Sequence, residues 1–130
     1  MATEEPRRVD LTDEAASLLR RLTDKHGPLM VHQSGGCCDG SSPMCFPQGE
    51  FQTSEADILL GELPVPGLSR AVPFWMSVSQ YEYWKYTHLT VDVVPGRGGG
   101  FSVESPEGVR FLIRSRLLTD AEIDHFQLAA

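Results

Sequence analysis

The three cysteines of the chain, Cys37, Cys38 and Cys45, lie in one short stretch, "GGCCDGSSPMC". Thiolates are soft ligands that suit zinc, iron or copper(I). Three ionised thiols repel one another, so a bound cation would explain why they gather. Gly36 and Gly40 allow the backbone to bend and to approach a bound group closely. The stretch therefore predicts a metal site built on cysteine.

A closed tetrahedral site needs a fourth ligand, whereas an open site leaves that position to water. His32 is the histidine nearest to the cysteines in the sequence and is the expected fourth ligand, with His88 in reserve. Asp39 and Glu50 offer oxygen ligands nearby. No C-x-x-C pair of the zinc-finger kind is present. The expected metal ligands are Cys37, Cys38, Cys45 and His32.

A structural interpretation of the same residues stays open. Cysteine is often a buried, small apolar residue, and Cys37 or Cys38 could serve only that purpose. A histidine on a strand, such as His32, is often a hydrogen-bonded core residue rather than a ligand. The spacing alone does not decide between a metal site and a packed core.

Composition limits the classes of protein to which the chain can belong. Its 130 residues are 41% hydrophobic, which fits one domain with a core. It carries 18 acidic and 11 basic residues, a net charge of -7 that would repel nucleic acid. No apolar run approaches the ~20 residues of a membrane span, and the N-terminus lacks the apolar core of a signal peptide. We expect a cytoplasmic protein, in a reducing compartment where clustered cysteines bind metal or react.

Two helices are predicted, one near each end of the chain. Thr12 can cap a helix that carries an apolar stripe and ends at Gly27. Near the C-terminus, Thr119 and Glu122 form a capping-box pattern. A third, short helix is expected in the aromatic stretch 80–88. The helices would position the strands that lie between them.

Alternating or short apolar runs predict strands over 29–34, 56–63, 74–79 and 88–94. A hairpin is expected over 101–116, with its turn at residues 106–108. We therefore predict a single α+β domain over residues 1–130, of short, mostly antiparallel or mixed strands. Residues 1–9 are expected to be a flexible tail.

The motif "HQSGGCCDGSSPMC", with "WKYTHLTVDVVPGRGGGFSVE" and "RFLIRSR", carries a resemblance over nearly the full length. The chain resembles an uncharacterised family of small bacterial proteins, a domain of unknown function, often encoded beside aldehyde dehydrogenases. The resemblance implies a functional context, aldehyde oxidation, and an aldehyde dehydrogenase as a partner.

The layout also resembles the A-type iron–sulfur carrier, or HesB-like, fold. The matching segments are "LTDEAASLL", "GGCCDG" and "GGFSVESPEG", and Cys37 would correspond to the first cluster cysteine of that family. The carriers end in a C-G-C pair, whereas no cysteine follows Cys45 here. The resemblance implies a HesB-like fold, without an iron–sulfur cluster held in the carrier manner.

The expected function is that of a metal-binding accessory protein for an aldehyde dehydrogenase, with zinc, iron or copper in the cysteine loop. Two alternatives stay open. An enzyme could use an open metal site to polarise an aldehyde, or use Cys37 or Cys38 as a nucleophile with His32 as base. A redox sensor would form a disulfide between the cysteines under oxidation.

Five aromatic residues lie close together in the sequence, and a small core would not easily bury all of them. They are Phe74, Trp75, Tyr81, Tyr83 and Trp84. We therefore expect a homodimer or a docking surface in this region.

Overall fold

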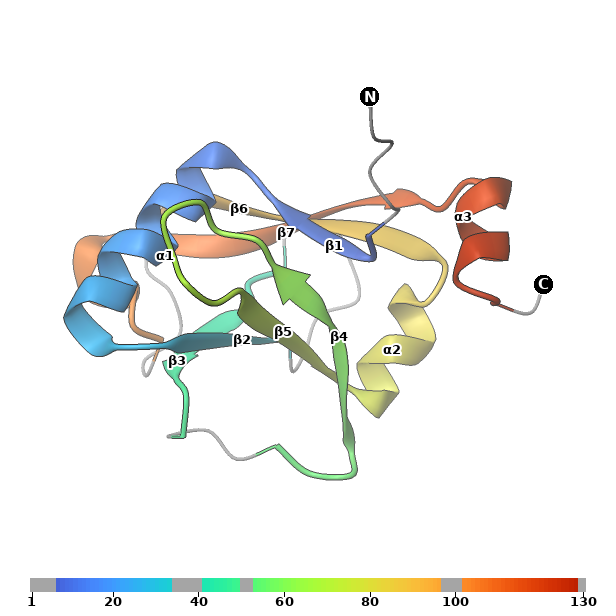
Figure 1. Ribbon diagram of the computed structural model, residues 1–130, viewed down its shortest axis with the longest axis horizontal. Coiled ribbons are helices and arrows are strands. Elements are labelled where there is room, and N and C mark those ends of the chain that lie inside the picture. The colour runs from blue at the N-terminus through green and yellow to red at the C-terminus, as the bar shows by residue number, and fades with distance from the viewer. Residues whose placement is uncertain (1–6, 34–40, 50–52, 97–101, 129–130) are drawn as a thin grey trace.

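The computed structural model describes residues 7–33, 41–49, 53–96 and 102–128. These described residues form two β-sheets and three α-helices (Figure 1). In chain order the elements are β1 (Val9–Leu11), α1 (Asp13–His26), β2 (Leu29–Gln33), β3 (Met44–Pro47), β4 (Asp57–Leu63), β5 (Val72–Ser77), α2 (Val78–Trp84), β6 (Thr87–Pro95), the 3-10 helix η1 (Ser105–Glu107), β7 (Val109–Leu117) and α3 (Asp120–His125).

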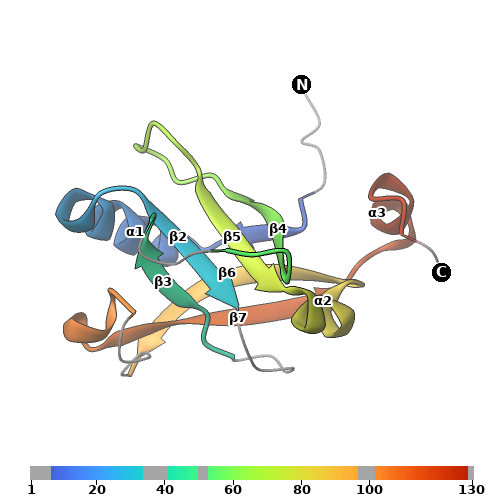
Figure 2. The ribbon, with the colours of Figure 1, turned by 90° about the horizontal axis from the view of Figure 1, so that it is seen from below.

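Both sheets are mixed. The first has the order β1-β6-β7, with β1 parallel to β6 and β7 antiparallel to it. The second has the order β3-β2-β5-β4, in which only β2 and β5 are parallel. The sheets lie face to face as two layers (Figures 1 and 2). The edge strands β1 and β4 are in contact, and on the other side the Ile113 amide donates to the Ser41 carbonyl at 2.7 Å. The two layers therefore share one core.

Helix α1 lies along one side of the two layers (Figure 2) and buries its apolar stripe in that core. The Thr12 hydroxyl accepts from the Ala15 amide at 3.2 Å, which caps the helix as predicted. Leu18, Leu19 and Leu22 are buried. The strands contribute inward-facing apolar side chains from both sheets. Burial of this apolar surface is the main force that holds the layers together.

The predicted α+β class, the mixed strands and the helix near each end are confirmed. The strands expected over 29–34, 56–63, 74–79 and 88–94 correspond to β2, β4, β5 and β6, and the short aromatic helix to α2. The predicted hairpin over 101–116 is wrong, because β7 pairs with β6, with Val91 opposite Ile113. The segment before it forms η1 instead, and Gly108 caps the end of η1 with a positive φ of 74°.

Two short strands were not predicted. β3 lies inside the stretch that we interpreted as a cysteine loop, so Cys45 is a strand residue. β1 overlaps the expected tail at Val9, which is buried and pairs with Leu89. Strands of three and four residues are too short to show a period in the sequence.

The aromatic residues that suggested a dimer lie mostly inside the protein. Phe74 and Trp84 are buried, and Tyr81 packs against the core. Trp75 is half-buried, and only Tyr83 of the five is largely exposed, at 66%. The core thus accommodates most of these rings. The homodimer stays a prediction that light scattering can test.

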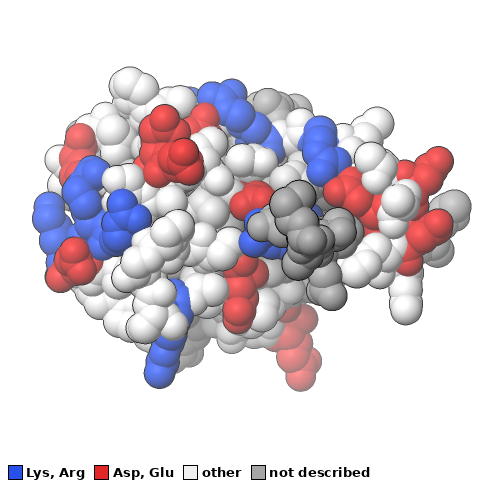
Figure 3. Space-filling model, turned by 45° about the horizontal axis from the view of Figure 1, so that its top comes forward, with Lys and Arg blue, Asp and Glu red and all other residues white. Residues whose placement is uncertain are grey.

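Charged side chains are distributed over the surface in both signs. On the face that Figure 3 shows, acidic side chains gather at the end formed by α3 and basic ones at the opposite end, with both signs interspersed between them. No helix in the described part of the chain is long and apolar enough to cross a membrane.

The close approach of β4 to β1 predicts that Gly61→Ala destabilises the fold. A Cβ at Gly61 would lie 2.9 Å from Val9 Cγ1, and Val9 is only 1% exposed and cannot move aside. Overpacking of this kind costs about 1–3 kcal/mol. That cost exceeds the roughly 0.4–1 kcal/mol that alanine gains by restricting the unfolded chain. Urea unfolding of the variant should show the loss of stability.

Val9→Ala provides the matched control for this contact. In the Val9→Ala background the new methyl group meets no Cγ1, so Gly61→Ala should cost less there than in the wild type. Equal costs in the two backgrounds would contradict the contact between β4 and β1.

Candidate functional site

The pairing of β2 with β3 places two of the predicted ligands on opposite faces of one sheet. Val31 lies opposite Cys45, and His32 lies opposite Met44. Residues that are directly opposite share a face, and successive residues alternate. Cys45 therefore points into the core, with Val31, whereas His32 points to the outer face. The structure does not bring these two residues together.

The remaining predicted ligands are placed as follows. Cys37 and Cys38 lie outside the described residues, as do the oxygen alternatives Asp39 and Glu50, so their part in a metal site stays a prediction. His88 lies on the outer face of the other sheet, opposite Arg116. Burial and the nearby Arg116 lower the pKa of His88. His88 is therefore on the far side of that sheet from the core.

Cys45 belongs to a buried polar cluster between the two sheets, which also contains Ser102 and Glu104. The Cys45 amide donates to Ser102 Oγ at 2.8 Å, and the Val103 amide donates to the Cys45 carbonyl at 3.0 Å. The Ser102 hydroxyl donates to Glu104 Oε1. Cys45 and Glu104 are 0% exposed and Ser102 is 2% exposed. The Ser102 hydroxyl thus links the backbone of buried Cys45 to the buried carboxyl group of Glu104.

Burial raises the pKa of both acidic side chains in this cluster, Cys45 and Glu104. It raises the pKa of the Cys45 thiol far above its ordinary value, and the charge of Glu104 raises it further. Burial also raises the pKa of Glu104, while the Ser102 hydroxyl and nearby backbone amides lower it only in part. Glu104 Oε2 is buried and has no hydrogen-bond partner within the described ranges. Negative charge here therefore lacks full compensation from the described residues.

A cation would supply that compensation. Thiolate sulfur and carboxylate oxygen are both zinc ligands once they have lost their protons. Among the residues that the structure describes, no three His, Cys, Asp or Glu side chains could together hold one ion. Cys45 and Glu104 could thus provide two ligands, and the rest would come from water or from the other parts of the chain.

Sequence reasoning missed Ser102 and Glu104. The predicted hairpin over 101–116 assigned no role to either residue. In the structure the segment lies against β3 instead, because the Val103 amide bonds to the Cys45 carbonyl. The alternation of Ser102 and Glu104 about Val103 did indicate a shared side, but it did not indicate which side is buried.

His32 has a different partner, on the outer face. Its Nε2 lies 2.7 Å from Asp57 Oδ1, and the Ser54 amide donates to Asp57 Oδ2 at 2.9 Å. His32 is 3% exposed. The hydrogen bond from His32 lowers the pKa of Asp57, and the Ser54 amide lowers it further. The pair links β2 to the start of β4 across β5, as expected of a hydrogen-bonded structural histidine.

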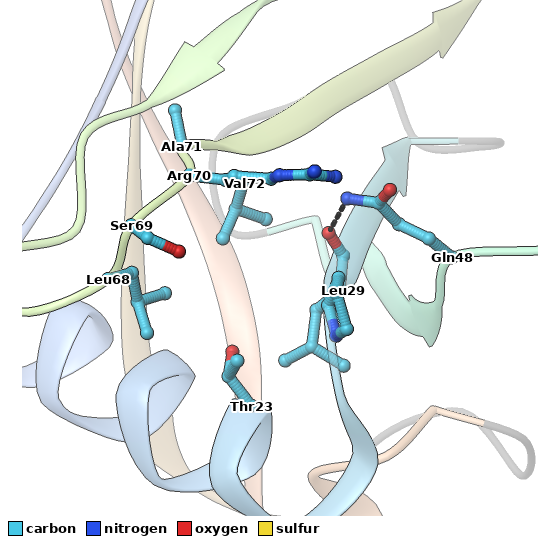
Figure 4. A pocket seen from close by; sticks show the side chains of 9 residues that line it. Thr23, Leu29, Gln48, Leu68, Ser69, Arg70, Ala71 and Val72 are labelled. Carbon is cyan, nitrogen blue, oxygen red and sulfur yellow. Dashed lines mark hydrogen bonds between the residues drawn. The ribbon is translucent and has the colours of Figure 1, made fainter.

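A cavity of about 120 Å³ lies elsewhere, between the end of α1 and the starts of β2 and β5 (Figure 4). Leu29, Leu68 and Val72 line it, and Arg70 extends across it toward Gln48. The Gln48 side chain donates to the Leu29 carbonyl at 3.0 Å. No His, Cys, Asp or Glu is among its described lining residues. The cavity therefore offers no anionic ligand for a metal.

The link between His32 and Asp57 predicts that Asp57→Asn destabilises the protein by about 1–3 kcal/mol, because a buried ring loses its charged partner. The pKa of Asp57 is lower in the fold than its ordinary value of 3.8. The stabilisation should therefore be complete above pH 3.8 and be lost as the pH falls through the folded-state pKa. Unfolding curves of wild type and variant should thus converge in acid.

Glu55→Gln is the matched control, since Glu55 is exposed and lies two positions away in the same turn. It should leave stability unchanged at neutral pH. An Asp57→Asn protein as stable as this control would show that the pair does not hold β2 to β4.

Comparison with known proteins places the chain in a family. No curated protein matches it. The family model described as "Domain of unknown function (DUF779)" matches residues 18–117, which include α1 from Leu18 onward, both sheets except β1, and all three residues of the buried cluster. The chain therefore belongs to the DUF779 family.

Proposed function

We propose that the protein is a metal-binding accessory protein for an aldehyde dehydrogenase, and that Cys45 anchors the metal in the core. The observation that carries the proposal is buried Cys45, linked through the Ser102 hydroxyl to the buried carboxyl group of Glu104, whose Oε2 has no partner in the described part of the chain. Both groups are metal ligands.

The physical reason is the cost of the cluster without a cation. A buried polar atom that lacks a hydrogen bond costs about 1–3 kcal/mol, and an uncompensated buried charge costs more. Apolar residues of similar volume would avoid this cost entirely. Metal coordination would stabilise both groups, because a bound cation favours the deprotonated thiolate and carboxylate forms, which burial disfavours.

In the sequence, the cysteine stretch lies between two strands of the described sheet. It connects Gln33, the buried last residue of β2, to β3, where Cys45 lies. Cys37 and Cys38, which lie outside the described residues, would supply further thiolates. Glu104 replaces His32 in this ligand set, because His32 faces away from Cys45 and bonds to Asp57.

The other uses of the cysteines have less support. A redox sensor needs an accessible thiolate, whereas Cys45 is fully buried and its thiol pKa is raised. The role beside an aldehyde dehydrogenase is supported by the resemblance to proteins encoded beside such enzymes. Metal supply or docking, rather than turnover, is the role that we assign.

Elemental analysis of anaerobically purified protein tests the proposal. Wild type should carry zinc, iron or copper, and Cys45→Val should lose it while keeping the core filled. Val91→Ala is the control, since Val91 is equally buried and carries no ligand atom. It should keep its metal. An aldehyde dehydrogenase retained on the metal-loaded protein but not on Cys45→Val would link the site to the partner.

Two results would overturn the proposal. One is a wild-type protein without metal whose stability does not change when zinc, iron or copper is added. The other is a Cys45→Val protein that keeps full metal content.

A further inference from the structure

We infer that the cavity beside the end of α1 binds a small organic monocarboxylate, with its short apolar chain inside the cavity and its carboxylate on Arg70. The inference uses none of the residues of the proposed metal site and does not depend on that site. It adds a class of ligand that the proposed function does not include.

The first argument is the lining of the cavity. Leu29, Leu68 and Val72 point into it from three sides (Figure 4), and Leu29 and Val72 are almost fully buried. Ligand sites typically combine such an apolar lining with a few polar groups that orient the ligand. The cavity has a volume of about 120 Å³. Since a cavity of about 150 Å³ holds one benzene molecule, an acid of about four or five carbons would fill this one.

The second argument is the positive charge at the cavity. Arg70 is the only charged residue among the described lining residues, and its exposed guanidinium group extends across the cavity toward Gln48 (Figure 4). Among the residues that the structure describes, neither this group nor the Ser69 hydroxyl has a hydrogen-bond or ion-pair partner. A guanidinium group binds a carboxylate through two parallel hydrogen bonds, and a serine hydroxyl can donate another. The lining therefore offers donors for one carboxylate.

The charge of the surrounding surface has the same sign. The end of α1, which contributes Thr23 to the cavity, lies at the end of the molecule opposite α3 (Figure 1). Basic side chains gather at that end (Figure 3), although the net charge of the whole chain is -7. An anion is therefore attracted to this end of the protein.

The third argument is that the wall that carries Arg70 is held in place. This wall is the loop between β4 and β5, and Arg20 Nη1 ties it to α1 by donating to the Pro66 carbonyl at 2.8 Å. Within the loop the Leu68 amide donates to the Val65 carbonyl at 3.2 Å, and Val65 is buried. A ligand that enters a site already formed loses less free energy to the ordering of the loop.

Titration of the full chain with butyrate, followed by methyl NMR, tests the inference. The methyl signals of Leu29, Leu68 and Val72 should shift, and those of Leu89, in the other sheet, should not. Affinity should rise about fourfold for each carbon added from acetate to butyrate, because each methylene group leaves water. The neutral isostere butyramide should bind at least about tenfold more weakly than butyrate, because it lacks the charge that Arg70 recognises.

Arg70→Met separates the charge of Arg70 from its packing, since methionine keeps an apolar side chain over the cavity. The variant should bind butyrate at least about tenfold more weakly than wild type and butyramide equally well. Arg21→Met is the matched control, because it removes a positive charge from an exposed ion pair between α1 and Glu107. It should keep its butyrate affinity.

Three results would overturn the inference. They are the absence of butyrate shifts at the cavity methyl groups, equal affinity for butyrate and butyramide, and unchanged butyrate affinity in Arg70→Met. Inorganic phosphate that displaces butyrate at equal concentration would also overturn it, since phosphate makes no use of an apolar lining. The proposed metal site would stand after any of these results, because elemental analysis tests it separately.

Discussion

The register between β2 and β3 is the constraint on which the site depends. With Val31 opposite Cys45, the thiol enters the core and the His32 ring goes to the outer face. A shift of one residue would exchange the two, because side chains alternate along a strand. The register is fixed from both sides, since Val31 is fully buried and His32 is bound to Asp57. The pairing therefore decides which residue can meet a metal in the core.

That register also gives the segment around Ser102 its place. The Cys45 amide donates a hydrogen bond to the Ser102 hydroxyl, and the Cys45 carbonyl accepts one from the Val103 amide. These two bonds dock the segment on β3, and Glu104 in this segment is fully buried. The cluster thus forms because the backbone amide and carbonyl of an edge strand need hydrogen-bond partners. It needs no dedicated loop in the described residues.

Local signals in the sequence predicted most of the helices and strands, but they did not predict the residues that form the site. The caps at Thr12 and Thr119 and the apolar runs predicted the long helix, the last helix and most strands, because those signals act over a few residues. The hairpin around Gly108 was wrong because a turn signal does not say which strand β7 will join. Cys45 was identified by its residue type, while Glu104 was missed because its burial depends on contact with β3, far away in the sequence.

The division between an inner ligand pair and an outer histidine is the central claim, and X-ray absorption at the metal edge tests it most directly. For zinc bound to the purified protein, we predict a first shell that contains sulfur near about 2.3 Å and oxygen near about 2.0–2.2 Å. The scattering pattern of a coordinated imidazole should be absent. A shell with imidazole scattering, or one without sulfur, would contradict the account.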